Sequence, residues 1–289
     1  MAPEPPCTPR GPRPPNRPRP PKERRDAEPL ITSAERRREL GSSFAEQQSL
    51  REAREYDALR PRYPEQAVQD ILGLSSAEPP RIADLGAGTG ILTRQLLARG
   101  ARLDAVEPSE AMTQVLAETA GEHADRLRIT RAPAERTGLE GSSADVVVAA
   151  QAWHWFDAEA VQQEIARILV PGGALALIWN YLDTGDATVH RLTRIMRAGD
   201  VYRPGWSPAL DSGLFGPVRS SEHRWSRSLS VAEIFRYATT LSSWLSAGEA
   251  DRARRRANLE DYLLRERGLR EDDAVGLPVI TVLHSTRLR

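Results

Sequence analysis

The run Arg81-Ile-Ala-Asp-Leu-Gly-Ala-Gly-Thr-Gly90 decides the fold of this chain. It starts as a short, mostly apolar segment and passes into glycines at positions 86, 88 and 90, and residues 91–100 then repeat apolar side chains with helical spacing. The pattern predicts a strand, a tight turn and a helix. Glycine tolerates a positive φ and lets the backbone approach a ligand, and the N-terminus of the next helix offers unpaired N–H groups. We therefore expect a small-molecule site at this turn.

The spacing of the glycines limits the choice of cofactor. A dinucleotide fingerprint, G-x-G-x-x-G, needs a glycine where this chain has Ile91. The next apolar run, residues 102–107, ends in Glu107, and a carboxylate at the tip of a strand can accept hydrogen bonds from both hydroxyls of a ribose. These features favour a ribose-bearing cofactor without a pyrophosphate over the helix. An NAD(P)-dependent dehydrogenase is the alternative enzyme, and Ile91 disfavours it.

Strand-like and helix-like segments alternate after the glycine turn. Near-continuous apolar strands separated by amphipathic helices predict an α/β fold, with a mostly parallel sheet covered on both faces. Right-handed crossovers then bring the glycine turn and the carboxyl ends of the strands to one edge. We expect strands at 81–86, 102–107, 127–130, 145–150 and 174–179, helices at 91–99, 109–120 and 157–169, and a turn at 171–173.

The segments that flank this core are assigned more coarsely. Capping patterns and a helix-starting proline indicate helices before it, and the region after the fifth strand has no clear period at first. We expect helices at 43–56 and 64–74, a less regular region at 183–226 with a helical stretch at 186–199 and a loop at 203–217, helices within 230–266, and a β-strand at 277–286.

Composition excludes several classes of protein. The single cysteine, Cys7, rules out an internal disulfide, and no apolar run approaches the roughly 20 residues that span a bilayer. The N-terminus lacks the apolar stretch of a signal peptide. A soluble cytoplasmic protein is therefore expected. No spacing of histidines and cysteines resembles a metal site, so we expect no metal.

The N-terminal segment differs from the rest of the chain. Residues 1–25 carry seven basic and two acidic side chains, although the chain as a whole has 40 of each sign. Of the 22 prolines, 11 fall within residues 1–30. Such a segment cannot bury enough apolar surface to fold. We expect a disordered Pro/Arg-rich tail at 1–30, either a dispensable extension or an arm for nucleic acid or another partner, before one domain at 31–289.

Five motifs resemble those of one family. Asp84-Leu-Gly-Ala-Gly-Thr-Gly90, Val106-Glu-Pro-Ser109 and Pro171-Gly-Gly173 are similar to motifs of class I S-adenosylmethionine-dependent methyltransferases. Gln151-Ala-Trp-His-Trp-Phe-Asp157 and Arg60-Pro-Arg-Tyr-Pro64 narrow the resemblance to the methyltransferase type 11 group, close to trans-aconitate methyltransferase-like proteins.

The resemblance has consequences for the fold and the cofactor. It implies S-adenosyl-L-methionine as cofactor and a Rossmann-like, mostly parallel seven-stranded sheet with an antiparallel last strand. It also implies a cofactor-binding core at about 55–180, with substrate or lid insertions at about 183–266.

The same resemblance assigns roles to polar residues. Glu107 is expected on the ribose, and Asp84 near the amino group of the cofactor unless it caps N–H groups of its own loop. Arg60 is expected to pair with the cofactor carboxylate, unless its motif only ends one helix and starts another. The backbone near Ala134 and Glu135 is expected to hold the adenine edge, where many relatives have an Asp or Asn.

Apolar contacts complete the predicted site. Tyr56 or Tyr63 would pack against the sulfonium as a cation–π contact, and Met112 would line the adenine or belong to the core. The predicted cofactor-binding set is Tyr56, Arg60, Tyr63, Asp84, Gly86, Gly88, Gly90, Glu107, Pro108, Met112, Ala134, Glu135, Gln151 and Trp153.

His154 is the one catalytic candidate. Methyl transfer from a sulfonium releases a neutral thioether, so it needs no acid, and it needs a base only when the acceptor carries a proton. His154 stands among Trp153, Trp155 and Phe156. It is either a base toward a hydroxyl or carboxylic acid, or a residue that hydrogen-bonds the backbone while the aromatic side chains line the pocket.

The acceptor is expected to be a small molecule, held between residues 151–157 and the irregular region at 183–226. Arginines such as Arg191, Arg194, Arg197 and Arg203 would bind a carboxylate there. A nucleic-acid or protein methyltransferase is one alternative, although the Asn/Asp-Pro-Pro-Tyr motif typical of base methylation is absent after the fourth strand. A non-catalytic cofactor-binding regulator is the other, because a fold alone does not establish activity. Neither a membrane nor a nucleic acid is the expected partner, and the oligomeric state is not predicted.

Overall fold

The computed structural model describes residues 49–198 and 202–289, so the predicted tail at 1–30 lies outside the described residues. The first residues of the helix expected at 43–56 lie outside them as well. Its described part is α2 (Leu50–Leu59), which starts at a capping box: the Ser49 hydroxyl accepts from the Glu52 N–H, and the Glu52 carboxylate accepts from the Ser49 N–H.

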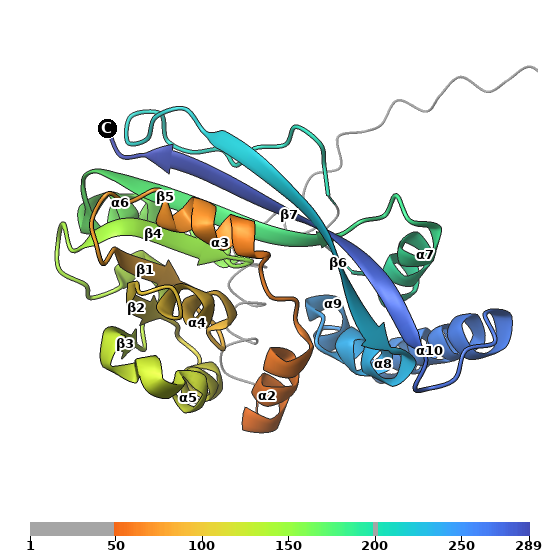
Figure 1. Cartoon of the computed structure of the whole chain (residues 1–289). Helices are drawn as coiled ribbons and strands as arrows, with labels where there is room; N and C mark the ends of the chain where they lie inside the picture. The colour runs from red at the N-terminus through yellow and green to blue at the C-terminus, as the bar shows by residue number, and fades with distance from the viewer. Residues whose placement is uncertain (1–48, 199–201) are drawn as a thin grey trace, which may run out of the picture.

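A seven-stranded sheet forms the centre of the fold (Figure 1). Its strand order is β3-β2-β1-β4-β5-β7-β6. The first five strands pair in parallel, and β7 pairs antiparallel with both β5 and β6. The predicted α/β fold, with its antiparallel last strand, is thereby confirmed. The strands are β1 (Arg81–Leu85), β2 (Arg102–Val106), β3 (Leu127–Thr130), β4 (Ala144–Ala150), β5 (Leu169–Leu182), β6 (Arg219–Ser230) and β7 (Ala274–Arg287).

Helices cover both faces of the sheet, which explains why its central strands are apolar at successive positions. Alternate side chains of a strand point to opposite faces. In β4, Val146 and Val148 pack with α3 (Glu65–Leu72) and α4 (Ile91–Leu97) on one face. Val147 and Ala149 pack with α6 (Ala158–Ile168) on the other. Both faces are therefore part of the core.

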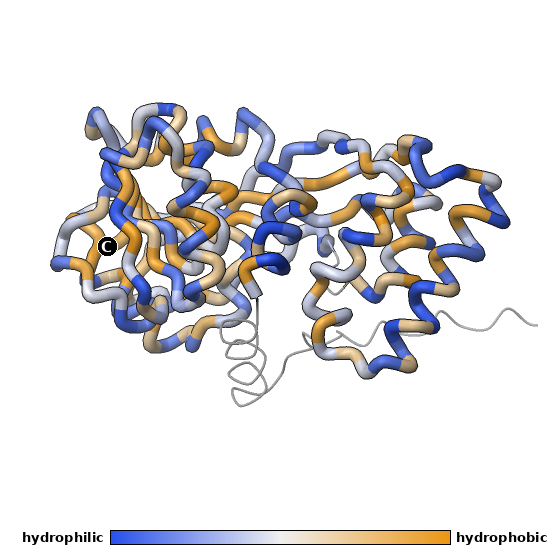
Figure 2. Tube along the Cα trace, turned by 90° about the horizontal axis from the view of Figure 1, so that it is seen from below, coloured by the Kyte–Doolittle hydropathy of each residue, from blue (hydrophilic) through white to orange (hydrophobic). Residues whose placement is uncertain are grey.

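A second group of helices surrounds the far ends of β6 and β7. Their apolar side chains form a separate cluster with Leu229, Val275 and Leu277 of the two strands. α2 contacts both the helices that cover the sheet and this second group, since it packs against α5 (Glu110–Thr119) and α8 (Val231–Thr239). Figure 2 shows apolar segments inside both parts and hydrophilic segments outside. The group comprises α7 (Ala187–Met196), α8 (Val231–Thr239), α9 (Ser242–Leu245), α10 (Glu249–Glu260) and a π-helical turn (Asp261–Glu266).

The predicted strands and helices of the core are present, but β6 was not predicted. It begins inside the region expected to be irregular. The strand was missed because most of its side chains are polar or charged, at its exposed and at its half-buried positions alike. β6 is an edge strand that pairs only with β7 among the described strands, and charged side chains are common on such edges. Helices α8 to α10 connect the two strands, so they do not form a tight hairpin. β5 is also longer than expected, since it includes the predicted turn at 171–173.

The described residues contain neither a membrane-spanning helix nor a grouped set of metal ligands. Within 49–198 and 202–289, no helix combines the length and the apolar character needed to cross a bilayer. In the same ranges, no three or more His, Cys, Asp or Glu side chains are grouped so that they could hold a metal ion.

Candidate functional site

The glycine turn lies at the carboxyl end of β1, and its three glycines meet different demands. All have positive φ, 69° at Gly86, 56° at Gly88 and 81° at Gly90. A Cβ on Gly86 would lie 2.6 Å from the Ala152 Cβ, and one on Gly90 would lie 2.1 Å from a methyl of Leu116. A Cβ on Gly88 would meet no atom within 4 Å. Close packing thus explains the outer two glycines, whereas Gly88 borders open space that a ligand can occupy.

Glu107, at the tip of β2, is held in place against this turn. One carboxylate oxygen accepts from the Gly88 N–H at 3.0 Å and the other from the Ser109 N–H at 2.9 Å. Burial raises the pKa of Glu107, and the two backbone N–H groups oppose that rise. An ionised carboxylate has about four acceptor sites, so it retains capacity for two hydroxyl donors.

Asp84 is buried in β1 with one oxygen unused. Its Oδ2 accepts from the Thr93 hydroxyl at 2.6 Å, whereas its Oδ1 has no hydrogen-bond partner among the described residues. Burial raises the pKa of Asp84 from 3.8 to about 7, the Thr93 hydrogen bond opposes the rise, and the charge of Glu107 adds to it. The alternative that Asp84 caps N–H groups of its own loop is wrong. A buried acceptor without a donor is costly, and a cationic ligand group would satisfy it.

The segment before the core places Arg60 beside two aromatic rings. Its guanidinium carbon lies 4.7 Å from the ring centre of Tyr56 and 5.7 Å from that of Tyr237. One of its terminal nitrogens donates to the Thr240 carbonyl at 2.7 Å, and its buried Nε has no acceptor in the described part of the chain. Tyr63 instead packs in the core near α3 and α4, and burial first, then the charges of Tyr56 and Asp84, raise its pKa well above the ordinary value.

The residues expected around an adenine are mostly buried. Met112 packs with Ala53 of α2, and Ala134 belongs to the cluster on the α6 face of the sheet. The Glu135 carboxylate accepts from the Asp157 N–H at 2.7 Å, so this side chain ties its loop to the start of α6. Pro108 is exposed on the turn after β2.

The loop after β4 forms an aromatic wall. Gln151 adopts a positive φ of 58°, unusual for a residue with a side chain, and donates to the Asn180 carbonyl while its own buried Oε1 has no partner within the described ranges. The Trp153 ring meets the Phe156 ring edge-on, and the His154 ring lies 4.6 Å from the Trp155 ring centre. The aromatic wall thus consists of Gln151, Trp153, His154, Trp155 and Phe156. Apart from the indole N–H groups, its polar side-chain atoms come from Gln151 and His154.

A cavity of about 870 Å³ adjoins this wall. Strands β5, β6 and β7, helix α8 and residues 202–207 provide its other sides. Of the predicted set, Tyr56, Arg60, Gln151, Trp153 and His154 line it, as do Arg197 and Arg203. The residues that do not line it are Tyr63, Asp84, Gly86, Gly88, Gly90, Glu107, Pro108, Met112, Ala134, Glu135, Arg191 and Arg194. Lining residues that were not predicted include Trp179, Trp206, Arg227, Tyr237 and His284. The alternation around Trp225 was the only signal for β6, and thus for Arg227.

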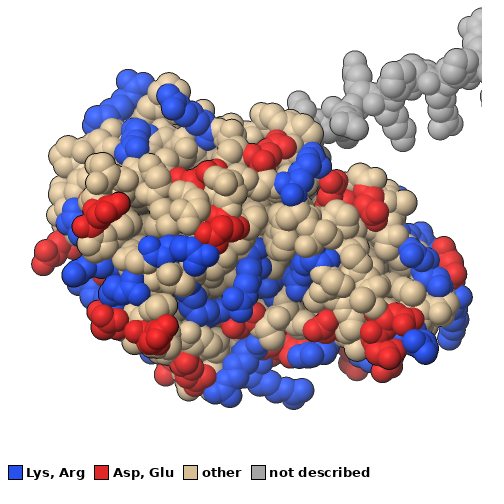
Figure 3. Space-filling model, in the orientation of Figure 1, with Lys and Arg blue, Asp and Glu red and all other residues tan. Residues whose placement is uncertain are grey.

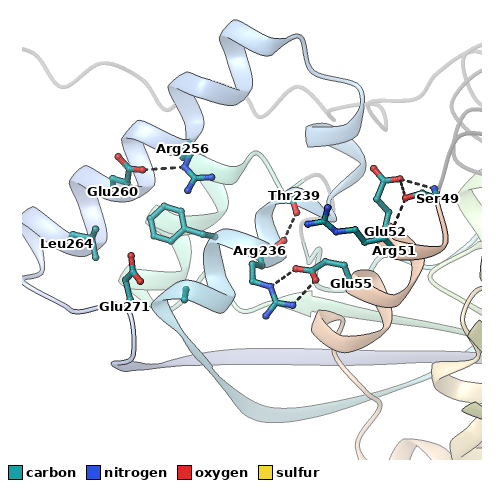
Figure 4. A pocket seen from close by; sticks show the side chains of 12 residues that line it. Ser49, Arg51, Glu52, Glu55, Arg236, Thr239, Arg256, Glu260, Leu264 and Glu271 are labelled. Carbon is teal, nitrogen blue, oxygen red and sulfur yellow. Dashed lines mark hydrogen bonds and ion pairs between the residues drawn. The ribbon is translucent and has the colours of Figure 1, made fainter.

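Charged surface elsewhere is largely self-paired. Basic and acidic side chains are interspersed over the face shown in Figure 3. A groove of about 830 Å³ between α2, α8 and α10 is lined by such pairs, with Arg236 donating to Glu55 and Arg256 to Glu260 (Figure 4). Because these charges neutralise each other, the cavity beside the aromatic wall is the candidate site.

Comparisons with known proteins show similarity to methyltransferases. Residues 83–177 match the model of a family described as "Methyltransferase domain". An uncharacterized methyltransferase of Mycobacterium tuberculosis is 30% identical over 231 residues, which are 78% of this chain and 90% of that protein. A probable S-adenosylmethionine-dependent methyltransferase of Saccharomyces cerevisiae is 26% identical, over 54% of this chain and 53% of that one. The solved structure of a putative type II methyltransferase from Anaeromyxobacter dehalogenans is similar with a TM-score of 0.53 and 29% identity, and the match covers 80% of this chain and 97% of that one.

Proposed function

Because this chain belongs to the class I S-adenosylmethionine-dependent methyltransferases, we propose that it methylates a small molecule, at a carboxylate or hydroxyl oxygen, in the cavity beside the aromatic wall. The observation that carries the proposal is the pairing of open space at Gly88 with the unsatisfied Oδ1 of Asp84. An ammonium group would satisfy this oxygen with a charge-assisted hydrogen bond, which is about twice as strong as one from a neutral donor.

The residues present fit S-adenosylmethionine. Glu107 would accept from the ribose hydroxyls, Asp84 would face the ammonium, and the unused Nε of Arg60 would donate to the carboxylate. Met112 and the backbone near Ala134 would border the adenine. Bound there, the cofactor supplies an electrophilic methyl group on its sulfonium sulfur, and the sulfur becomes a neutral thioether once the methyl group is transferred.

The chain's own contribution is to position the acceptor and exclude water. Trp153, Trp155 and Phe156 would keep water from the reacting atoms, where it would compete with the acceptor. An acceptor carboxylate carries no proton at neutral pH and needs no base, whereas a hydroxyl would require His154 to take its proton. The size of the cavity supports a small acceptor, since pockets for such ligands range over about 300–1,000 Å³.

A calorimetric titration with S-adenosylhomocysteine tests the cofactor. We expect micromolar binding to the purified chain, no comparable binding of NADH, and a loss of about tenfold or more in a Glu107→Ala variant. Tritiated S-adenosylmethionine and fractionated small-molecule extracts then test transfer. Preference for NADH, or label found only in protein or nucleic acid, would refute the proposed function.

A further inference from the structure

One end of the cavity is an uncharged aromatic corner. The Trp206 ring is 43% exposed and stands perpendicular to the rings of Trp179 and His284, at 5.6 Å and 5.5 Å between ring centres. His284 is buried, its Nδ1 lies 2.7 Å from the Ser220 hydroxyl, and burial lowers its pKa despite the nearby charge of Glu222. A neutral imidazole and two indoles make a surface for a flat apolar group.

A second place in the cavity carries positive charge. Arg227 of β6 and Arg60 both direct their guanidinium groups at the ring of Tyr237, each 5.7 Å from its centre. Arg227 is half-buried and has neither a hydrogen-bond acceptor nor an ion-pair partner for its side chain among the described residues. Burial, and to a lesser degree the charge of Arg60, lowers its pKa, while Tyr237 and Glu233 act in the opposite direction. Glu233 acts on Arg227 only from beyond ion-pair distance, and a half-buried cation without an ion-pair partner favours an anion beside it.

The other arginines that line the cavity have different surroundings. Arg255 and Arg197 both contact Asp251, and Arg255 also donates to the Ser243 carbonyl. Arg203 is exposed, so water solvates its charge. Besides Arg60, Arg227 is therefore the cavity-lining arginine, within the described ranges, whose charge is both partly removed from water and without an ion-pair partner.

The charges of the proposed cofactor leave Arg227 without an anion. That cofactor has one carboxylate, which the Nε of Arg60 would bind, and one ammonium, which Asp84 would bind. Because Arg60 would use the cofactor carboxylate, an anion that pairs with Arg227 would come from the acceptor. This step rests on the proposed function.

Apolar side chains lie between the two places. Ser220, beside the aromatic corner, pairs in register with His284, and Arg227 pairs with Leu277 at the other end of the same ladder. At about 3.3 Å a residue, the seven steps from Ser220 to Arg227 span about 23 Å along β6, and the long side chains of Arg227 and Trp206 both line the cavity. Leu182, Val279 and Val282 line the stretch between, together with the exposed Glu222.

We propose that the acceptor is an elongated amphipathic anion, whose anionic group pairs with Arg227 and whose apolar end packs in the corner of Trp206, Trp179 and His284. Carboxylate and phosphate share the chemistry that Arg227 recognises. The proposal concerns recognition, and leaves the methylated oxygen as proposed above.

The test is a set of calorimetric titrations of the full chain, with and without S-adenosylhomocysteine. The probes are 6-phenylhexanoate, its amide, 6-phenylhexyl phosphate, and phenylacetate as a short analogue. We expect at least one of the two long anions to bind about tenfold more tightly than the long amide, which carries no charge, and than phenylacetate, which cannot reach both ends. Whichever long anion binds more tightly identifies the source of the charge.

Variants assign the two ends separately. Arg227→Gln should abolish the preference for anion over amide, Arg227→Lys should retain most of it, and Trp206→Ala should reduce the preference for the long acid over phenylacetate. Arg219→Gln, on the same strand but outside the cavity, should change neither preference. Equal binding of acid and amide to the unaltered chain would overturn the proposal without any variant, and so would an undiminished preference in Arg227→Gln.

The same titrations distinguish failure of the amphipathic acceptor from failure of the proposed methyltransferase function. Binding of S-adenosylhomocysteine with no preference for an anionic probe refutes the amphipathic acceptor alone. Failure of S-adenosylhomocysteine to bind the unaltered chain refutes the proposed function, whatever the probes do.

Discussion

The two sides of the candidate site are built in different ways. On the cofactor side, Gly88, Glu107 and Asp84 lie at the ends of adjacent parallel strands, and backbone conformation and backbone N–H groups position them. On the acceptor side, Arg227, Trp206 and His284 come from distant segments, and side-chain packing positions them. The first arrangement constrains residue identity tightly, whereas the second can change its specificity one side chain at a time.

The largest expected effect is on the packed edge of the glycine turn. Gly90→Ala places a Cβ 2.1 Å from Leu116 and keeps a positive φ, so we expect the free energy of unfolding to fall by about 2–4 kcal/mol. Chemical denaturation measures the change. Gly100→Ala is the matched control, because its φ is 96° but its Cβ meets nothing, and it should cost about 1 kcal/mol. Equal costs at both positions would show that backbone conformation, and not packing, sets the requirement.

Gly88 separates binding from stability on the same turn. Gly88→Ala meets no atom of the chain, so we expect only about 1 kcal/mol of lost stability. Its methyl group would enter the space assigned to the cofactor, and affinity for S-adenosylhomocysteine should fall about tenfold or more. Unchanged affinity in calorimetry would show that the cofactor does not bind against this turn. The cofactor side of the site would then be wrongly assigned.

Asp84 predicts a pH dependence on the cofactor side alone. Its folded-state pKa of about 7 lies above the ordinary 3.8, so its contribution to stability is complete below pH 3.8 and is lost as the pH rises through about 7. An ammonium ligand prefers the ionised carboxylate, so S-adenosylhomocysteine should bind about five- to tenfold more tightly at pH 8 than at pH 6.

Two variants check the assignment to Asp84. Asp84→Asn should remove the pH dependence in calorimetry. Asp145→Asn should retain it: although burial alone would raise the pKa of Asp145, hydrogen bonds from Arg81 hold it below the ordinary value, so this group does not titrate between pH 6 and 8. A pH profile that persists in Asp84→Asn would assign the titration to another group.

The smallest expected effect belongs to the charged groove between α2 and α8. Glu55→Gln breaks the pair with Arg236, whose side chains are 30% and 52% exposed, so the free energy of unfolding should change by at most about 1 kcal/mol. Binding of S-adenosylhomocysteine should not change. A large loss of affinity would mean that the contact between α2 and α8 affects cofactor binding.

The cofactor side, which backbone conformation positions, was predicted better from the sequence than the acceptor side, which side-chain packing positions. The glycine turn, Glu107 and the parallel strands have local patterns, because strand, turn and helix each require particular residues at fixed spacing. Tyr63 was expected, as an alternative to Tyr56, to pack against the sulfonium. Its ring lies in the core near α3 and α4, where the Gln95 side chain accepts from its backbone N–H. Only the packing of distant helices decides that choice.

The acceptor side was predicted least well. Arg227 lies on a polar edge strand, for which the alternation around Trp225 is only a weak signal. Nothing in the sequence indicates its pairing with β7 or its approach to Tyr237. Arg191 and Arg194 were expected to line the pocket, yet they lie on α7 outside it. A run of arginines indicates positive charge, but only the fold decides which of them faces the cavity.

The position of β7 also has a consequence for synthesis of the chain. β6 has β7 as its only partner in the described sheet, and the two are separated by residues 231–273. During translation, Arg227 therefore leaves the ribosome long before the strand that holds it in place. The glycine turn and its neighbouring strands can assemble earlier from segments that follow one another closely. A ribosome-bound nascent chain that ends before β7 should therefore still bind S-adenosylhomocysteine while lacking any preference for an anionic acceptor.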